Sequence, residues 1–167
     1  MILLTLVFAN LGICSQEVLH LEKTSTIKNN MQVQICKESP VDKKTVLNAI
    51  KFWNGINEDL LSDVVIKNCY NNVYKENIIT IKSDKEMLPF YAGLTSVKKK
   101  ENKITSASIK ILHDNKNNAN VITHEIGHAL GYQHSCKKDK KNIMNPYKNK
   151  NLVLDHKRYI TNSHQTR

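Results

Sequence analysis

Residues 124–134 read His-Glu-Ile-Gly-His-Ala-Leu-Gly-Tyr-Gln-His, and this is the most informative pattern in the chain. The apolar residues around it predict a helix over residues 121–130. On a helix, His124 and His128 lie four residues apart, so their imidazoles leave the same face one turn apart. That spacing lets both rings bind one zinc ion through a nitrogen. Glu125 can then reach a water on the metal without itself being a ligand.

Gly131 predicts how a third ligand arrives. Glycine takes a positive φ easily, so it can end the helix and turn the chain back towards the metal, bringing His134 with it. Three histidines leave one tetrahedral position for water, which is typical of a catalytic zinc. A lone histidine is more often solvated or a satisfied core residue, but five specified residues at fixed spacing favour a metal site. The remaining histidines are expected to lie outside it: His20, His113, His156 and His164.

These eleven residues match the metzincin signature H-E-x-x-H-x-x-G-x-x-H, and the chain resembles that family of zinc peptidases. Metzincins also carry a methionine turn, and Met144 follows His134 by ten residues. The alternative is that Met144 is an ordinary core methionine. Within the metzincins the chain is most similar to the matrixins, the branch of the matrix metalloproteinases. Further features carry this likeness: Ser135, Pro146, an early helix with Ala49, Trp53 and Asn54, and the stretch from 92–95 to Ile104 and Ile109.

The resemblance implies an α+β fold for a single metzincin-like catalytic domain over residues 31–167. Its parts would be a twisted, mostly parallel five-stranded sheet with an antiparallel edge strand, a long active-site helix, a Met-turn and a C-terminal helix. It also implies a zinc endopeptidase that holds one catalytic zinc ion. The ligands would be His124, His128 and His134, and Glu125 would be the general base of peptide hydrolysis.

A peptide or protein substrate would lie extended along the edge strand, according to the same resemblance. Gly93 and Leu94 would contact it there, and Pro146 and Tyr147 would border a specificity pocket. The chain also departs from the family. The sequence before residue 31 lacks the Pro-Arg-Cys-Gly-type switch of matrixin zymogens, and the Gly- and Asp-rich loops that hold calcium are missing. Calcium is therefore not expected.

Hydrophobic patterning predicts the other elements. Period-two alternation and Val/Ile content indicate strands at 31–36, 63–67, 77–82, 91–97 and 104–112. A helix is expected to start with Ser39 as N-cap, Pro40 at N1 and Asp42 at N3. Its buried face would hold Val46, Ile50 and Trp53, and Gly55 would end it. Residues 115–120 are predicted to be a polar loop, and residues 152–162 a last short helix.

The N-terminal residues 1–15 resemble a signal peptide. An apolar run over residues 2–14 suits the core of such a signal and is too short to span a bilayer, although no Lys or Arg precedes it. Cleavage is expected after Ser15, leaving residues 16–30 as a short exposed arm; lipidation at Cys14 is a second route. The protein would then be secreted or held at the cell envelope. A buried N-terminal strand or helix is the alternative.

Three cysteines remain after such processing: Cys36, Cys69 and Cys136. They allow at most one disulfide, with three possible pairings, and the sequence does not choose among them. None forms a C-x-x-C pair, so a cysteine zinc knuckle is not indicated.

The length and composition limit the number of domains and the kinds of partner that we expect. The 167 residues suffice for one domain with a core, and the formal charge is +10. Only two of the 25 basic residues are arginine and aromatics make up 6%, so a nucleic-acid surface is not expected. We expect a monomer without a transmembrane span. Two other functions are open: an inactive zinc-binding interaction module, and a basic binding protein with a structural zinc whose fourth ligand would be Cys136.

Overall fold

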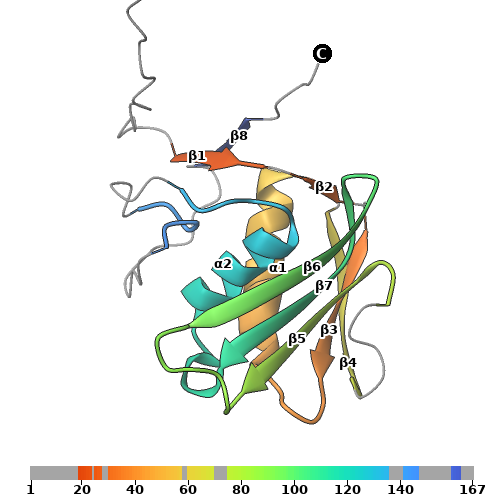
Figure 1. Cartoon of the computed structure of the whole chain (residues 1–167), viewed down its shortest axis with the longest axis vertical. Helices are drawn as coiled ribbons and strands as arrows, with labels where there is room; N and C mark the ends of the chain where they lie inside the picture. Colours follow the sequence, from red (N-terminus) through yellow and green to blue (C-terminus); the bar gives the residue numbers. More distant parts are fainter. Residues whose placement is uncertain are drawn as a thin grey trace, which may run out of the picture.

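The computed structural model describes residues 19–23, 25–27, 30–57, 60–69, 75–135, 141–146 and 159–162 (Figure 1). Eight strands and two α-helices are formed within these residues. In chain order they are β1 (Leu19–Glu22), β2 (Thr26–Ile27), β3 (Met31–Cys36), α1 (Lys43–Ile56), β4 (Leu61–Lys67), β5 (Ile78–Asp84), β6 (Gly93–Lys100), β7 (Lys103–Leu112), α2 (Ala119–Ala129) and β8 (Tyr159–Asn162), with a 3-10 turn at His113–Asn115. The five predicted strands and both main helices are confirmed, with small shifts of their ends.

Six strands form the main sheet. Their order is β2-β7-β5-β3-β4, and β6 pairs with β7 as well. All pairings are parallel except that of β6 with β7, which is antiparallel. The prediction of a mostly parallel sheet holds. The predicted number of five strands is wrong, because the short strand β2 pairs with the start of β7 and adds a sixth.

The segment predicted to be an exposed arm is built into the fold instead. Within residues 16–30, β1 and β2 are both strands, and the side chains of Leu21 and Ile27 are buried. β1 pairs in parallel with β8 in a separate two-stranded sheet. The predicted C-terminal helix is therefore wrong at Tyr159–Asn162, and residues 152–158 lie outside the described part, as do the signal peptide and Cys14.

Helix α1 begins three residues later than predicted. Asp42, not Ser39, is the N-cap: its carboxylate accepts hydrogen bonds from the backbone N of Thr45 at 2.8 Å and from its hydroxyl at 2.6 Å. Nor does Gly55 end the helix, which runs to Ile56 with Asn57 as C-cap. The predicted buried face is correct, since Val46, Ile50 and Trp53 all lie in the core.

The two helices cover one face of the main sheet and cross each other there (Figure 1). Trp53 of α1 fills the junction. Its indole Nε1 donates to the carbonyl of Thr123 in α2 at 2.9 Å, and its ring stacks on Tyr132 at 4.8 Å. The strands supply the opposing wall of the core with buried Ile79, Ile81, Ile109 and Ile111. This packing fixes α2, and with it the histidine motif, against the sheet.

A disulfide joins the end of β3 to the loop after β4. It pairs Cys36 with Cys69, so the pairing that the sequence left open is resolved, while Cys136 lies outside the described residues. Among the described helices, none has both the length and the apolar character needed to cross a membrane.

Candidate metal centre

Helix α2 carries the motif and is capped at both ends. At its start, the side chain of Asn118 accepts from the backbone N of Asn120 and Val121. At its end, Gly131 has φ of +91°, as predicted, and its N donates to the carbonyl of His128. The N of Tyr132 donates to the carbonyl of Gly127 in the same turn. This is the glycine-terminated geometry that reverses the chain after a helix.

The reversal brings three imidazoles together. The Nε2 atom of His128 lies 3.0 Å from Nε2 of His124 and 3.1 Å from Nε2 of His134. Zinc-bound nitrogens at 2.0–2.1 Å from a tetrahedral ion are about 3.3 Å from one another. The described residues hold one other group of potential ligands, Cys36, Glu38 and Cys69, but its sulfurs are bonded to each other.

Backbone carbonyls orient the first two rings. Nδ1 of His124 lies 2.7 Å from the carbonyl O of Ile143, and Nδ1 of His128 lies 2.9 Å from that of Tyr132. A carbonyl only accepts, so each Nδ1 carries the hydrogen and each Nε2 presents a lone pair. Two lone pairs 3.0 Å apart repel each other unless a cation lies between them. The donor set therefore fits a metal ion.

The electrostatics keep these rings neutral. Burial and, to a smaller extent, the neighbouring His128 and His134 lower the pKa of His124 to about 4, against the opposing effect of the Ile143 carbonyl. Burial also lowers the pKa of His128 and that of His134. Neutral imidazole is the form that binds metals, so the cluster is ready to coordinate at neutral pH.

Glu125 is buried on the side of α2 that faces strand β6. Its carboxylate Oε2 accepts a hydrogen bond from Oγ1 of Thr95 at 2.6 Å. Gly93, two residues earlier in β6, leaves room for it: a Cβ there would lie 2.5 Å from Cγ of Glu125. Burial raises the pKa of Glu125 to about 7, although the Thr95 hydrogen bond opposes the rise. A carboxylate with this pKa is a competent base near neutral pH.

The turn at residues 142–145 supports α2 from below the motif. Met144 is fully buried, and its Sδ would be 2.5 Å from a Cβ added at Gly127. The carbonyl of Met144 accepts from the backbone N of Ser135, next to the third histidine, at 2.8 Å. Through the Ile143 carbonyl, the same turn orients His124. One short segment thus contacts both ends of the histidine cluster.

The structure assembles most of the predicted site residues in one place. His124, Glu125, His128 and His134 are together, and Met144 lies beneath the helix that carries them. Gly93 contacts Glu125 by close approach, whereas Leu94 and Pro146 are exposed. Tyr147 lies outside the described residues.

Sequence reasoning missed Thr95 and the carbonyl of Ile143. A threonine in an alternating strand gives no sign of its partner. By contrast, the position of Ile143 beside Met144 could have suggested its role.

Comparison with known families supports this geometry. A family model described as matrixin, of the M10 peptidases, matches residues 81–160, from within β5 to the start of β8. No curated protein gives a significant match to the chain. The matched residues include the three histidines, Glu125, Thr95 and Met144. At the level of the family, the match indicates a zinc metallopeptidase of the hydrolase class. The segment that carries the histidine cluster is that of a matrixin-like metzincin.

Proposed function

We propose that this protein is a zinc-dependent endopeptidase. The observation that carries the proposal is the convergence of three Nε2 atoms, two of them fixed as lone-pair donors by backbone carbonyls. His124, His128 and His134 would hold one zinc ion. When bound, zinc would polarise the scissile carbonyl and make water a nucleophile at neutral pH.

Glu125 is the proposed general base. Its carboxylate would take the proton from the attacking water and deliver it to the leaving amine. Thr95 donates to Oε2 only, so it leaves the other carboxylate oxygen, Oε1, for this role. Oε1 is the oxygen nearer to Gly93. The Thr95 hydroxyl also lies 3.0 Å from the backbone carbonyl of Glu125, so it ties both the side chain and the helix to β6.

The turn at residues 142–145 is the proposed Met-turn. Its buried methionine packs against Gly127, which Trp53 also approaches closely, and the turn orients His124 through a carbonyl. We infer that it keeps the ligand rings in place rather than taking part in the reaction. The presence of Glu125 favours an enzyme over an inactive zinc-binding module, because a pure binder needs no base beside its ligands.

We also propose that the protein is exported, as a monomer. The apolar run at residues 2–14 and the Cys36–Cys69 disulfide support export, since disulfides persist mainly in oxidising compartments. Mass spectrometry of the native protein should find an N-terminus near Gln16 or a lipid at Cys14. An intact Met1 in cytosolic material would contradict export.

Three variants test the peptidase. The wild-type protein should cleave an unfolded protein substrate, lose that activity to a zinc chelator, and carry about one zinc per chain by elemental analysis. Glu125→Gln should keep the zinc and lose hydrolysis, because only the base is removed. His128→Ala should lose the zinc. His113→Ala is the matched control, since that ring lies outside the cluster, and it should keep both. Zinc binding without any cleavage by the wild type would favour the inactive module.

A further inference from the structure

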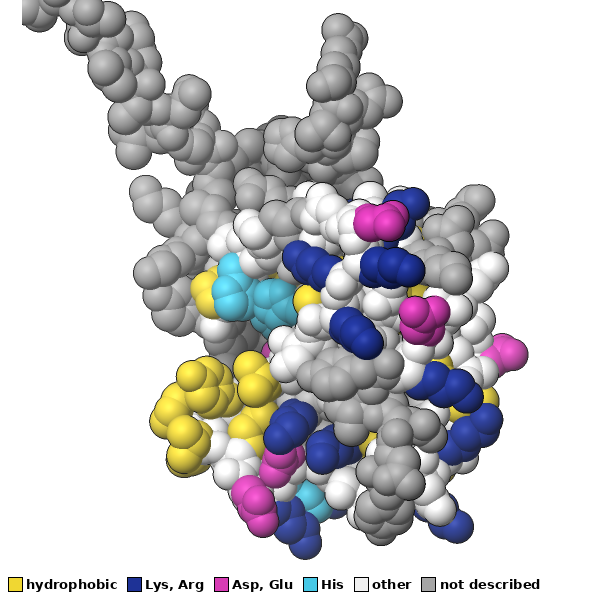
Figure 2. Space-filling view, turned by 45° about the vertical axis from the view of Figure 1, so that its right-hand side comes forward, with side chains coloured by type: hydrophobic (Ala, Val, Ile, Leu, Met, Phe, Trp, Pro, Cys, Tyr) yellow, Lys and Arg dark blue, Asp and Glu magenta, His cyan; other side chains and the backbone are white. Residues whose placement is uncertain are grey.

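The connection from β5 to β6 presents large hydrophobic side chains to solvent. Of the six exposed large hydrophobic side chains among the described residues, four lie within residues 88–94. They are Leu88 (56% exposed), Phe90 (69%), Tyr91 (46%) and Leu94 (47%), and we call them the apolar tip. Figure 2 shows hydrophobic side chains gathered at the lower left of one face, with basic side chains spread over the rest of it. A concentrated patch of this kind marks an interaction site, whereas scattered exposed hydrophobics need no explanation.

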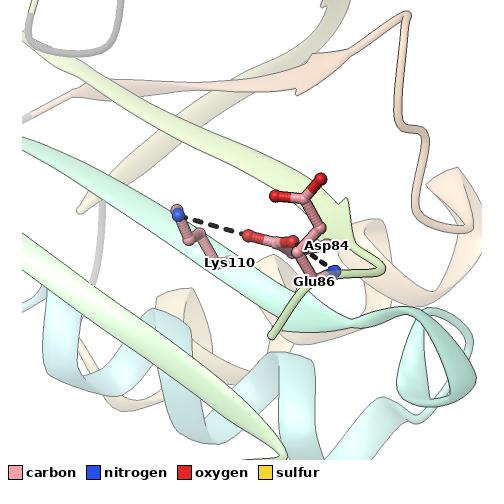
Figure 3. Close-up of polar contacts among 3 residues, drawn as sticks. All are labelled: Asp84, Glu86 and Lys110. Carbon is pink, nitrogen blue, oxygen red and sulfur yellow. Dashed lines mark hydrogen bonds and ion pairs between the residues drawn. The ribbon is translucent and has the colours of Figure 1, made fainter. Parts of the chain in front are cut away.

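The loop that carries the apolar tip is tied to the sheet. At its start, Asp84 pairs with Lys110 of β7 at 3.2 Å and accepts from the backbone N of Glu86 at 2.9 Å (Figure 3). Within the loop, the N of Tyr91 donates to the carbonyl of Leu88 at 3.0 Å. The hydrophobic side chains are therefore presented outwards on an anchored loop.

Lysines share the face of the sheet on which Leu94 lies. Side chains alternate along β6, and Thr95 contacts Glu125 of α2, so Leu94 points away from the helices. Residues directly opposite one another in neighbouring strands share a face, and Lys110 of β7 is opposite Leu94. By this register five lysines of β5, β6 and β7 lie on the face, and we call them the basic face: Lys82, Lys98, Lys100, Lys103 and Lys110.

Acidic side chains do not balance this charge. Residues 78–112, which span β5 to β7, hold seven lysines and three acidic residues. Within this described range one ion pair is formed, between Lys110 and Asp84. Lys100 and Lys103 are directly opposite each other at the end of the hairpin. Like charges in such positions destabilise a sheet, and an anionic surface beside them would relieve the repulsion.

The kinds of side chain on this face favour a lipid surface over a protein partner. Among the described residues, every basic side chain of the face is lysine. Protein–protein interfaces are enriched in arginine and depleted in lysine. Surfaces that bind membranes combine apolar side chains that enter the bilayer boundary with cationic side chains that meet anionic headgroups. Lysine suits this position because its long stem lies along apolar surface while its ammonium group stays in the polar layer.

We propose that the apolar tip and the basic face dock the protein on an anionic lipid bilayer. The tip would enter the boundary between headgroups and acyl chains, and the lysines would contact the headgroups. Gly93, which approaches Glu125 closely, is three residues from Phe90, at most about 11 Å along an extended chain. Docking would therefore hold the metal centre close to the bilayer. This last consequence rests on the proposed function, since it brings a peptidase to proteins of the membrane surface.

Vesicle binding tests the proposal without requiring cleavage. The protein is zinc-loaded Glu125→Gln that begins at Gln16 and carries no lipid, so the apolar run at residues 2–14 contributes nothing. Co-sedimentation should show binding to vesicles of phosphatidylglycerol and phosphatidylcholine at least tenfold stronger than to phosphatidylcholine alone, and added salt should weaken it. Adding Phe90→Ser should weaken the binding at least tenfold. Adding Lys100→Gln or Lys103→Gln should weaken it about fivefold each.

Helix α1, on the other side of the sheet, offers matched controls. Leu47 is as exposed as Tyr91, and Lys44 and Lys51 are exposed lysines of the same helix. Leu47→Ser and the double variant Lys44→Gln/Lys51→Gln should bind vesicles as tightly as the protein without them. Equal losses in the docking and control variants, or no vesicle binding at all, would overturn the proposal.

Fluorescence can locate the inserted side chains. Bromine-labelled acyl chains should quench the emission of Phe90→Trp, because the new indole enters the bilayer boundary. They should not quench the emission of Leu47→Trp, or that of the parent protein, in which Trp53 is fully buried. Equal quenching of Phe90→Trp and Leu47→Trp would contradict insertion of the apolar tip.

Other outcomes separate this proposal from its rivals and from the peptidase assignment. A concentration-dependent dimer that Phe90→Ser abolishes, without vesicle binding, would show that the face joins two copies of the chain and would overturn membrane docking. In the active protein, Phe90→Ser should slow cleavage of a peptide tethered to vesicles and leave cleavage of the same peptide in solution unchanged. Vesicle binding by a wild-type protein that cleaves nothing would overturn the peptidase assignment and leave the docking surface.

Discussion

Oγ1 of Thr95 lies 2.6 Å from Oε2 of Glu125, so a strand hydroxyl holds the carboxylate that we assign as the base. The two residues are 30 positions apart in the chain and belong to β6 and α2. The contact couples the proposed substrate strand to the catalytic helix. A substrate that shifts β6 would therefore also shift the base.

Removal of this hydroxyl should slow hydrolysis. A hydrogen bond to a charged group contributes about 1.5–3 kcal/mol, which corresponds to about a tenfold to hundredfold change in rate. Thr95→Val should lower kcat by that factor with KM and zinc content nearly unchanged, and Thr95→Ser should restore most of the rate. Wild-type kcat in Thr95→Val would show that the contact does not position the base.

Alanine at Gly127 should destabilise the protein even though alanine favours helix. The new Cβ would lie 2.5 Å from Sδ of Met144 and 2.6 Å from Cζ2 of Trp53. Such overpacking costs about 1–3 kcal/mol, which should appear in urea unfolding. Gly55→Ala is the matched control: this exposed helical glycine should gain about 0.5–1 kcal/mol. If Gly127→Ala and Gly55→Ala stabilised the protein equally, the close packing of Met144 and Trp53 on Gly127 would be contradicted.

A side chain of similar volume should replace Met144 at little cost in stability, whereas a truncated side chain should destabilise the protein. The side chain is fully buried, so Met144→Leu should cost less than about 1.5 kcal/mol. Met144→Ala should cost about 2–5 kcal/mol because it leaves a cavity. Thermal unfolding of the zinc-loaded proteins checks both values. If Met144→Ala unfolded like the wild type, the methionine would have no structural role.

The metal-free protein should show opposing pH effects from His124 and Glu125. The pKa of His124 falls from 6.5 to about 4 on folding, so the unfolded state binds more protons there and stability rises with pH up to about 6.5. The pKa of Glu125 rises from 4.5 to about 7 on folding, so the native state binds more protons there. Stability therefore falls as the pH rises from about 4.5 to about 7.

Glu125→Gln removes the second effect. The stability of this variant should therefore rise more steeply with pH than that of the wild type between about 4.5 and 6.5. Urea midpoints after chelation, measured across this range, check the slope. Parallel curves for the two proteins would contradict the buried environment of Glu125.

Reduction should weaken the fold. The Cys36–Cys69 bond closes a segment of 33 residues, and disulfides of natural proteins contribute about 2–4 kcal/mol. Urea unfolding with and without a reductant measures the loss. The double variant Cys36→Ser/Cys69→Ser should be as unstable as the reduced wild type, with or without the reductant. Any change that the reductant causes in this variant would not involve the Cys36–Cys69 bond.

The sequence predicted elements whose signal is local. Strand β3 alternates clearly, and the helix at the histidine motif has one apolar face, so both were found. The start of α1 was misplaced because Ser39 and Asp42 are both good N-caps, and only the bond from Asp42 to Thr45 decides between them. β1 and β2 were missed because their partners, β8 and β7, lie far along the chain and their pairing leaves no local pattern.

The residues of the candidate site also fall into two groups, those predictable from local sequence and those that depend on tertiary packing. The histidines, Glu125 and Gly131 have fixed spacing on one helix and its turn, so helical geometry alone places them together. Thr95 and the Ile143 carbonyl reach the site from other elements. Their roles depend on how β6 and the turn at 142–145 pack against α2. That packing is a property of the whole core, which no single stretch of sequence encodes.

The Gly131 turn also sets a limit on how the chain can be trimmed. A Cβ at Gly131 would meet the backbone carbonyl of Ser25, and Lys23 bridges to Tyr132, so the first strands form the wall behind the turn that delivers His134. Processing after Ser15 spares this wall. A cut between residues 23 and 30 would instead separate this wall from the rest of the domain, and we expect the turn that carries His134 then to lose its support.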